Sequence, residues 1–120
     1  MARSLTPLDP AEFTAICARI DTGTADRADL KAATKHLLAL LQRRAPGHSV
    51  EVRIPPFAAI QCIEGASHTR GTPPAVVETD PETWIALARG RLAWADARVR
   101  ASGERSDLTP LLPLVEDDAR

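Results

Sequence analysis

The sequence predicts an α+β fold in which helices pack on one face of a mixed or antiparallel sheet. The apolar residues between positions 9 and 45 recur every three or four residues, which is the period of an amphipathic helix. Between positions 49 and 63 the pattern changes to alternation and then to a nearly continuous apolar run, which is typical of strands. Helical and extended segments follow again up to residue 102, so helices and strands form separate layers of one fold.

The first two helices are predicted to form a hairpin over residues 9–45. Asp9 and Pro10 have the residue types of an N-cap and a first helical position, and this helix ends near Gly23. The second helix begins within residues 24–26 and continues to the end of the hairpin. The apolar stripes are Phe13, Ile16, Cys17 and Ile20 in the first helix, and Leu30, Ala33, Thr34, Leu37, Leu38 and Leu41 in the second.

Three strands are predicted after the hairpin. Residues 49–55 alternate between apolar and polar, which predicts a strand with one buried face. Residues 57–63 are apolar except for Gln61, which predicts a central strand covered on both faces. The Gly, Ser, Thr and Pro residues at 65–74 predict a mobile loop, and residues 75–79 predict the third strand. The buried face of the first strand should carry Val50, Val52 and Ile54.

A third helix follows and has both a start and a stop signal. Asp80 is a suitable N-cap because its carboxylate can accept from the unpaired N–H groups of the first turn. Pro81 suits the first helical position, where its missing N–H costs nothing. Trp84 and Leu87 lie on one apolar stripe, and Gly90 supplies a left-handed stop.

The C-terminal part is less regular. Residues 93–97 predict one or two further helical turns, and residues 98–102 alternate as a final strand would. Residues 108–115 predict an apolar extended tail because their prolines exclude a regular helix, and residues 116–120 predict an acidic frayed end.

Length and composition predict one cytoplasmic domain over residues 1–120, made of the hairpin at 9–45, the sheet and C-terminal helices at 49–115 and the frayed end. Hydrophobic residues make up 44% of the chain and charged residues 26%, as in ordinary globular proteins. A net charge of −1 gives no electrostatic attraction to nucleic acid. The N-terminus lacks the apolar segment of a signal peptide, and no run approaches the roughly 18 apolar residues that span a bilayer.

The polar residues form no pattern typical of catalysis or metal binding. His36, His48 and His68 are not accompanied by a nucleophile motif, and we expect them at the surface. Cys17 and Cys62 show no metal-ligand spacing and lie within apolar patterns, so we expect buried thiols, with a disulfide as the alternative. The sequence therefore predicts neither an enzyme nor a metal or cofactor site.

Residues 75–114 resemble the sterol carrier protein type 2 superfamily, and in particular its small actinobacterial branch of bacterial sterol carrier orthologues. The resemblance is carried by Thr-Asp-Pro, Glu-Thr-Trp-Ile-Ala-Leu and Gly-Arg-Leu within residues 79–92, and by Gly-Glu-Arg-Ser-Asp-Leu-Thr-Pro-Leu-Leu-Pro-Leu at 103–114. It implies a curved mixed sheet with helices on one face. Relatives carry about one more helical turn between residues 97 and 98, so either the connection there is unusually tight or a stretch is absent from this sequence.

The resemblance also implies a non-catalytic protein that binds or transfers lipid in a hydrophobic tunnel. Physical reasoning alone leaves open whether the apolar helix–sheet space is a packed core or a pocket. The tail at 108–115 is the expected movable cover. The residues predicted to line the space are Leu37, Leu41, Phe57, Ile60, Ile63, Trp84, Leu87, Trp94, Leu112 and Leu114.

Two further points concern the partners. Arg89 and Arg91 are candidates for contacting a lipid head group, although Arg is also favoured at a helix C-terminus for structural reasons. The expected ligand is a fatty acid or another lipid, and a membrane surface or a protein is a further candidate partner. The alternative hypothesis is a protein-interaction module of the same fold that carries no lipid. The sequence does not predict the oligomeric state.

Overall fold

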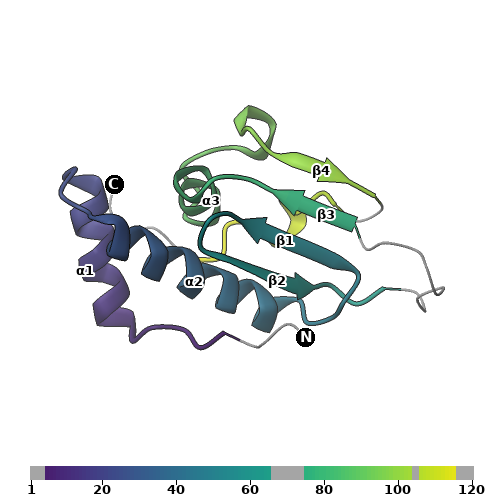
Figure 1. Ribbon diagram of the computed structural model, residues 1–120, viewed down its shortest axis with the longest axis horizontal. Helices are drawn as coiled ribbons and strands as arrows, with labels where there is room; N and C mark the ends of the chain where they lie inside the picture. Colours follow the sequence, from purple (N-terminus) through teal and green to yellow (C-terminus); the bar gives the residue numbers. More distant parts are fainter. Residues whose placement is uncertain (1–4, 66–74, 104–105, 116–120) are drawn as a thin grey trace.

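A computed structural model describes residues 5–65, 75–103 and 106–115 of the chain (Figure 1). The helices are α1 (Pro10–Asp21), α2 (Arg27–Arg44) and α3 (Pro81–Ala88). The strands are β1 (Val50–Ile54), β2 (Ala58–Cys62), β3 (Ala75–Glu78) and β4 (Arg100–Ser102). Two short 3₁₀ helices are η1 (Trp94–Asp96) and η2 (Thr109–Leu111). The predicted mobile loop lies outside the described residues except for Gly65, and the predicted frayed end lies wholly outside them.

The sheet is mixed and has the strand order β2-β1-β3-β4. β1 runs antiparallel to β2 and parallel to β3, and β4 runs antiparallel to β3. This confirms the predicted α+β class. The prediction that residues 57–63 form a central strand was wrong, because β2 lies at an edge of the sheet. A short turn pairs β2 with β1 on one side, and β3 occupies the other side of β1.

The sequence of β2 is almost entirely apolar, although only one face of the strand is buried. Ile60 and Cys62 are buried on one face, whereas Ala59 is exposed on the other. Alanine is small enough to face solvent at little cost, so its presence does not indicate a second covered face. Apolar content therefore gave a misleading prediction for this strand.

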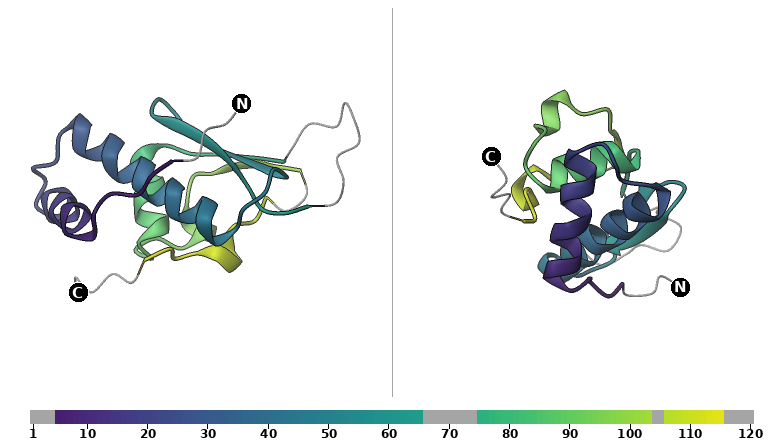
Figure 2. Two further views of the ribbon diagram at one scale, coloured as in Figure 1. Left: turned by 90° about the horizontal axis from the view of Figure 1, so that it is seen from below. Right: turned by 90° about the vertical axis from the view of Figure 1, so that its left-hand side faces the viewer.

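The helices cover the face of the sheet that carries the predicted alternation of β1. Val50, Val52 and Ile54 are each 0% exposed, while Arg53 on the opposite face is exposed and forms an ion pair with Glu51. α2 packs on β2, and α3 packs on α2. α1 contacts α2 and lies at the end of the molecule away from the strands (Figures 1 and 2).

The helix starts differ in how they are capped. The carboxylate of Asp80 accepts from the N–H and the hydroxyl of Thr83, each at 2.8 Å, as predicted. Asp26 and Asp29 form a reciprocal capping box at the start of α2. Asp9 occupies the N-cap position of α1, but its side chain makes no capping hydrogen bond. The prediction of a side-chain cap at Asp9 was therefore wrong.

The end of α3 confirms the predicted stop at Gly90. The φ angle of Gly90 is +76°, which a residue with a Cβ rarely adopts. The N–H of Arg91 donates to the carbonyl of Ala86 at 2.9 Å, which closes the last turn in a Schellman motif.

Beyond α3 the chain is more extended than predicted. Trp94 to Asp96 form a single 3₁₀ turn, and the final strand is shorter than the predicted 98–102 because it begins only at Arg100. Residues 97–99 connect the two elements, and the carbonyl of Arg98 accepts from the hydroxyl of Thr79 at 2.7 Å.

His36 is buried, contrary to the expectation of a surface histidine, with 6% of its surface exposed. Its ring stacks on Phe13 of α1 with 4.1 Å between the ring centroids. Its Nδ1 accepts from the N–H of Leu8 at 2.9 Å, so the ring must be neutral at that nitrogen. The segment before α1 crosses α2 at this position, which an analysis of α2 alone could not reveal.

Candidate functional site

The residues predicted to line the helix–sheet space lie in three different places. Leu37, Leu41, Ile60, Trp84, Leu87 and Leu114 are buried, and all but Leu87 belong to the main apolar cluster. Leu37 and Leu41 are 0% exposed, so neither side chain borders a space that could hold a water molecule. In this conformation these two leucines belong to a packed core.

Trp84 anchors α3 to α2 within that core. Its side chain is fully covered, and its Nε1–H donates to the backbone carbonyl of Thr34 at 3.3 Å. The hydroxyl of Thr34 is also buried, yet it has no hydrogen-bond partner among the described residues. A hydroxyl in that state destabilises the fold because it has lost its water without gaining another partner.

Three of the predicted residues meet at an open cleft of about 350 Å³, which we call the tail cleft. One wall is the end of α3 with the segment that leads into η1, and the other wall is the C-terminal tail from residue 108 to 115. Most of its lining is apolar. The lining residues are Leu87, Gly90, Arg91, Leu92, Ala93, Trp94, Thr109, Leu112 and Pro113.

The tail is held in place mainly through its backbone. The guanidinium of Arg44, at the end of α2, donates to the carbonyls of Leu111, Pro113 and Leu114 at 3.0, 2.8 and 3.2 Å. The N–H of Leu114 donates to the carbonyl of Ala88 at 2.8 Å. An arginine at the end of a helix is expected from the helix dipole alone. Nothing in a single sequence indicates its contact with a segment about 70 residues further on.

The remaining two predicted lining residues lie away from the tail cleft. Phe57 sits in the turn before β2, half-buried, with the guanidinium of Arg27 at 5.0 Å from its ring centroid. Ile63 follows β2, and its N–H donates to the carbonyl of Ala45 at 2.6 Å. The structure thus places Ile63 at the margin of the apolar cluster, whereas Phe57 packs against the guanidinium of Arg27.

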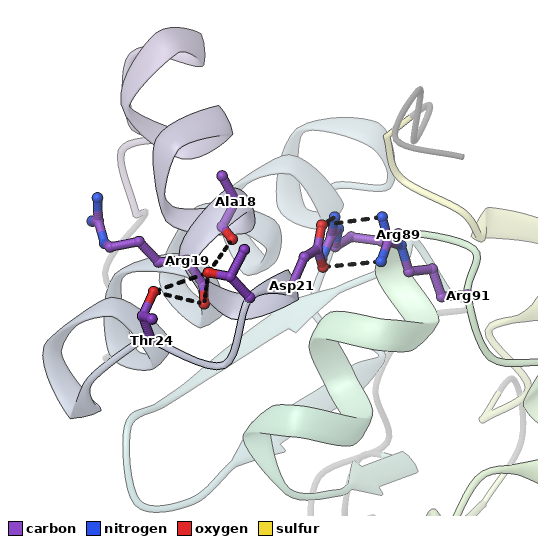
Figure 3. A network of polar contacts seen from close by, with 7 residues as sticks. Ala18, Arg19, Asp21, Thr24, Arg89 and Arg91 are labelled. Carbon is purple, nitrogen blue, oxygen red and sulfur yellow. Dashed lines mark hydrogen bonds and ion pairs between the residues drawn. The ribbon is translucent and has the colours of Figure 1, made fainter.

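Arg89 and Arg91, the candidates for head-group contact, both bind the carboxylate of Asp21 (Figure 3). Arg89 donates two hydrogen bonds of 3.0 Å each, and Arg91 donates bonds of 2.9 and 3.2 Å. The Arg89 side chain is only 4% exposed. A second open cleft, of about 380 Å³, lies beside these groups between the α1–α2 turn and α3. A lipid head group at this position would compete with Asp21.

Burial favours the neutral forms of two ionisable groups near the core, Cys62 and His36. Burial raises the pKa of the Cys62 thiol to about 11, so it carries almost no thiolate at neutral pH. Burial also lowers the pKa of His36. Cys17 and Cys62 are both buried thiols, as expected. Within residues 5–65, 75–103 and 106–115, no three His, Cys, Asp or Glu side chains gather as a metal site would require.

Together, a long helix on a mixed four-stranded sheet, a short capped helix and an extended apolar tail define a protein of the sterol carrier type. The family model of bacterial SCP orthologues matches residues 26–114, and the chain belongs to that family. The match begins at the N-cap of α2 and ends at Leu114 of the tail, so it includes the tail cleft, while α1 precedes it. No curated protein matches the chain. Among the described residues, no helix combines the length and the apolar character needed to cross a bilayer.

Proposed function

We propose that the protein is a non-catalytic, cytoplasmic carrier that binds a fatty acid, phospholipid or sterol-like lipid, and that hydrocarbon enters through the tail cleft. Membership of the bacterial SCP orthologues supports lipid binding or transfer at the level of the family. The observation that carries the proposal is the apolar cleft itself, which brings Leu87, Trp94 and Leu112 together beside a tail whose backbone accepts three hydrogen bonds from Arg44.

The size of the cleft indicates how binding would occur. A volume of about 350 Å³ is near the lower end of the roughly 300–1,000 Å³ typical of small-molecule pockets. A long acyl chain would therefore occupy the cleft completely only if the tail moved outward. Each methylene then removed from water would contribute about 0.8 kcal/mol, which offsets the contacts that the tail gives up.

The tail is suited to such a movement because it belongs to neither the sheet nor a long helix. After the single turn of η2 it is extended, and the bonds from Arg44 and to Ala88 are its polar attachments to the rest of the described structure. Its apolar attachments are Leu108 and Leu114, both buried. Leu114 would leave the apolar cluster on opening, and the lipid would replace it there.

A second candidate function is a protein-interaction module that carries no lipid. The observation in its favour is the full burial of Leu37 and Leu41, because a core already filled by its own side chains needs no ligand. In that case the tail would be a fixed part of the fold. The two candidates differ in whether a lipid binds and stabilises the protein.

Titration with a fluorescent long-chain fatty acid tests the proposal. We expect micromolar affinity, because ordering costs reduce the gross gain from the buried chain, and we expect a rise in melting temperature at saturation. Leu112→Gln should weaken binding about tenfold, since it places an amide against the acyl chain. The matched control is Leu111→Gln, which changes a half-buried neighbour outside the cleft lining and should change affinity less than about threefold.

Two results would count against the proposal. If saturating fatty acid gave neither a binding signal nor a thermal shift, the carrier function would be rejected and the interaction module would stand. If Leu111→Gln weakened binding as much as Leu112→Gln, lipid would bind but not in the tail cleft.

A further inference from the structure

Among the described residues, the guanidinium of Arg44 is bound only by uncharged groups. Its three hydrogen-bond acceptors are the backbone carbonyls of Leu111, Pro113 and Leu114. Within the described ranges, no carboxylate lies within ion-pair distance of it. The guanidiniums of Arg19 and Arg89, by contrast, bind carboxylates at 2.7 and 3.0 Å.

Arg44 and the tail cleft contact the same stretch of the tail. Leu112 and Pro113 form part of the cleft wall, and the carbonyls of Leu111 and Pro113, on either side of Leu112, accept hydrogen bonds from Arg44. Residues 111–113 of the tail therefore contact both an apolar space and a cation. An outward movement of the tail would widen the space and release the guanidinium at the same time.

We propose that Arg44 binds the carboxylate of a fatty acid when the tail opens, in exchange for the tail carbonyls. This inference rests on the proposed lipid-binding function and adds to it a residue that selects the head group. A guanidinium matches a carboxylate with two parallel N–H···O bonds, and the opposite charges add a Coulombic attraction that neutral carbonyls do not provide. The exchange therefore favours the open state only when the ligand is an anion.

The exposure of Arg44 fits this role. Arg44 lies at the surface, so a carboxylate bound to it would keep contact with water while the hydrocarbon chain extends into the cleft. A bound carboxylate would thus avoid the large free-energy cost of burying a charge. Arg89 fits less well because the carboxylate of Asp21 already satisfies two of its donors.

The test compares a long-chain fatty acid with the fatty alcohol of the same chain length, each displacing an uncharged fluorescent lipid from the full-length protein. We expect the wild type to bind the acid about tenfold more tightly than the alcohol, equivalent to about 1.4 kcal/mol. Arg44→Gln should abolish this preference by weakening the binding of the acid. The alcohol should bind as well as before or better, because the tail is held less firmly. Arg43→Gln removes the same charge from the same exposed helix end and should keep the preference.

The outcomes separate the inference from the function on which it rests. A residue that only fastens the tail would change acid and alcohol affinity by the same factor, and that result would overturn the inference. Equal binding of acid and alcohol by the wild type would overturn it while leaving the carrier function intact. If the wild type bound neither the acid nor the alcohol, both the inference and the carrier function would be rejected. If Arg44→Gln does not fold, Arg44→Lys is the second variant, because it keeps the charge but cannot form two parallel N–H···O bonds to a carboxylate. A severalfold smaller preference for the acid over the alcohol would support the inference, and an unchanged preference would overturn it.

Discussion

The carboxylate of Asp21 forms two hydrogen bonds to the guanidinium of Arg89, each 3.0 Å long, and joins the end of α1 to the end of α3 (Figure 3). Asp21 precedes the part of the chain that matches the family, and Arg89 lies within it. The Arg89 side chain is 4% exposed, so its charge depends on protein groups rather than on water for stabilisation. α1 is thus attached to the core by a buried charge.

Replacing Asp21 with Asn should therefore lower the free energy of unfolding by about 1.5–3 kcal/mol, the range for a hydrogen bond to a charged partner. Urea denaturation measures this loss. The control is Arg19→Gln, which breaks a paired but solvent-exposed contact with Asp29 and should cost less than about 1 kcal/mol. Equal losses in the two variants would mean that burial of Arg89 adds nothing to the strength of its pair.

Thr34→Val should raise stability by about 1 kcal/mol, because it replaces a buried hydroxyl without a partner by a methyl group of similar shape. The bond from Trp84 is retained, since it uses the backbone carbonyl of Thr34. Thr34→Ser is the matched control: it keeps the hydroxyl, removes the methyl group and should destabilise. Urea midpoints for both variants check the prediction, and a destabilised Thr34→Val would show that the hydroxyl has an acceptor in solution.

The sequence was sufficient where structure depends on neighbouring residues. The cap at Asp80 and the stop at Gly90 are both local, because each depends on groups within a few positions of it. The buried face of β1 followed from simple alternation, since one face of that strand is covered and the other carries Glu51 and Arg53.

The sequence was insufficient where structure depends on distant partners. β2 lies at an edge of the sheet because β3 occupies the other side of β1. His36 is buried because the segment before α1 crosses α2 at that position. The candidate site is a similar case. Apolar residues were recognised as such, but their division between a closed core and the tail cleft depends on how the tail is held by Arg44.

Stability should fall as the pH drops below about 6.5 because of His36. Burial lowers its pKa below the ordinary value of 6.5, so the unfolded chain takes up the proton first as pH falls. The contribution of His36 to the free energy of unfolding is therefore fully present above pH 6.5 and is lost as the pH falls toward the pKa of the folded state. The loss is no more than about 1.4 kcal/mol per pH unit.

Urea denaturation between pH 8 and pH 5 measures this slope, and His36→Gln, which keeps an acceptor for the N–H of Leu8, should remove most of it. The carboxylate of Asp29 does not interfere in this range. The hydrogen bond from Arg19 lowers the pKa of Asp29 to about 2, so the contribution of Asp29 is lost only at lower pH, below the ordinary carboxylate range. A slope that persisted in His36→Gln would contradict the assignment.

Gly90→Ala should loosen the tail, whereas Gly23→Ala should not. Both glycines have φ near +75°, so a Cβ adds comparable backbone strain of about 1 kcal/mol at each position. Only at Gly90 would the new Cβ meet the tail, at 3.2 Å from the Cβ of Pro113, while at Gly23 it would meet nothing within 4 Å. We expect Gly90→Ala to be the less stable variant and to expose the amides of Leu114 and Val115, which donate to the carbonyl of Ala88, to faster hydrogen exchange. Exchange at these two amides that is equal in both variants would show that Pro113 yields without moving the tail, and that Gly90 is required for its backbone conformation alone.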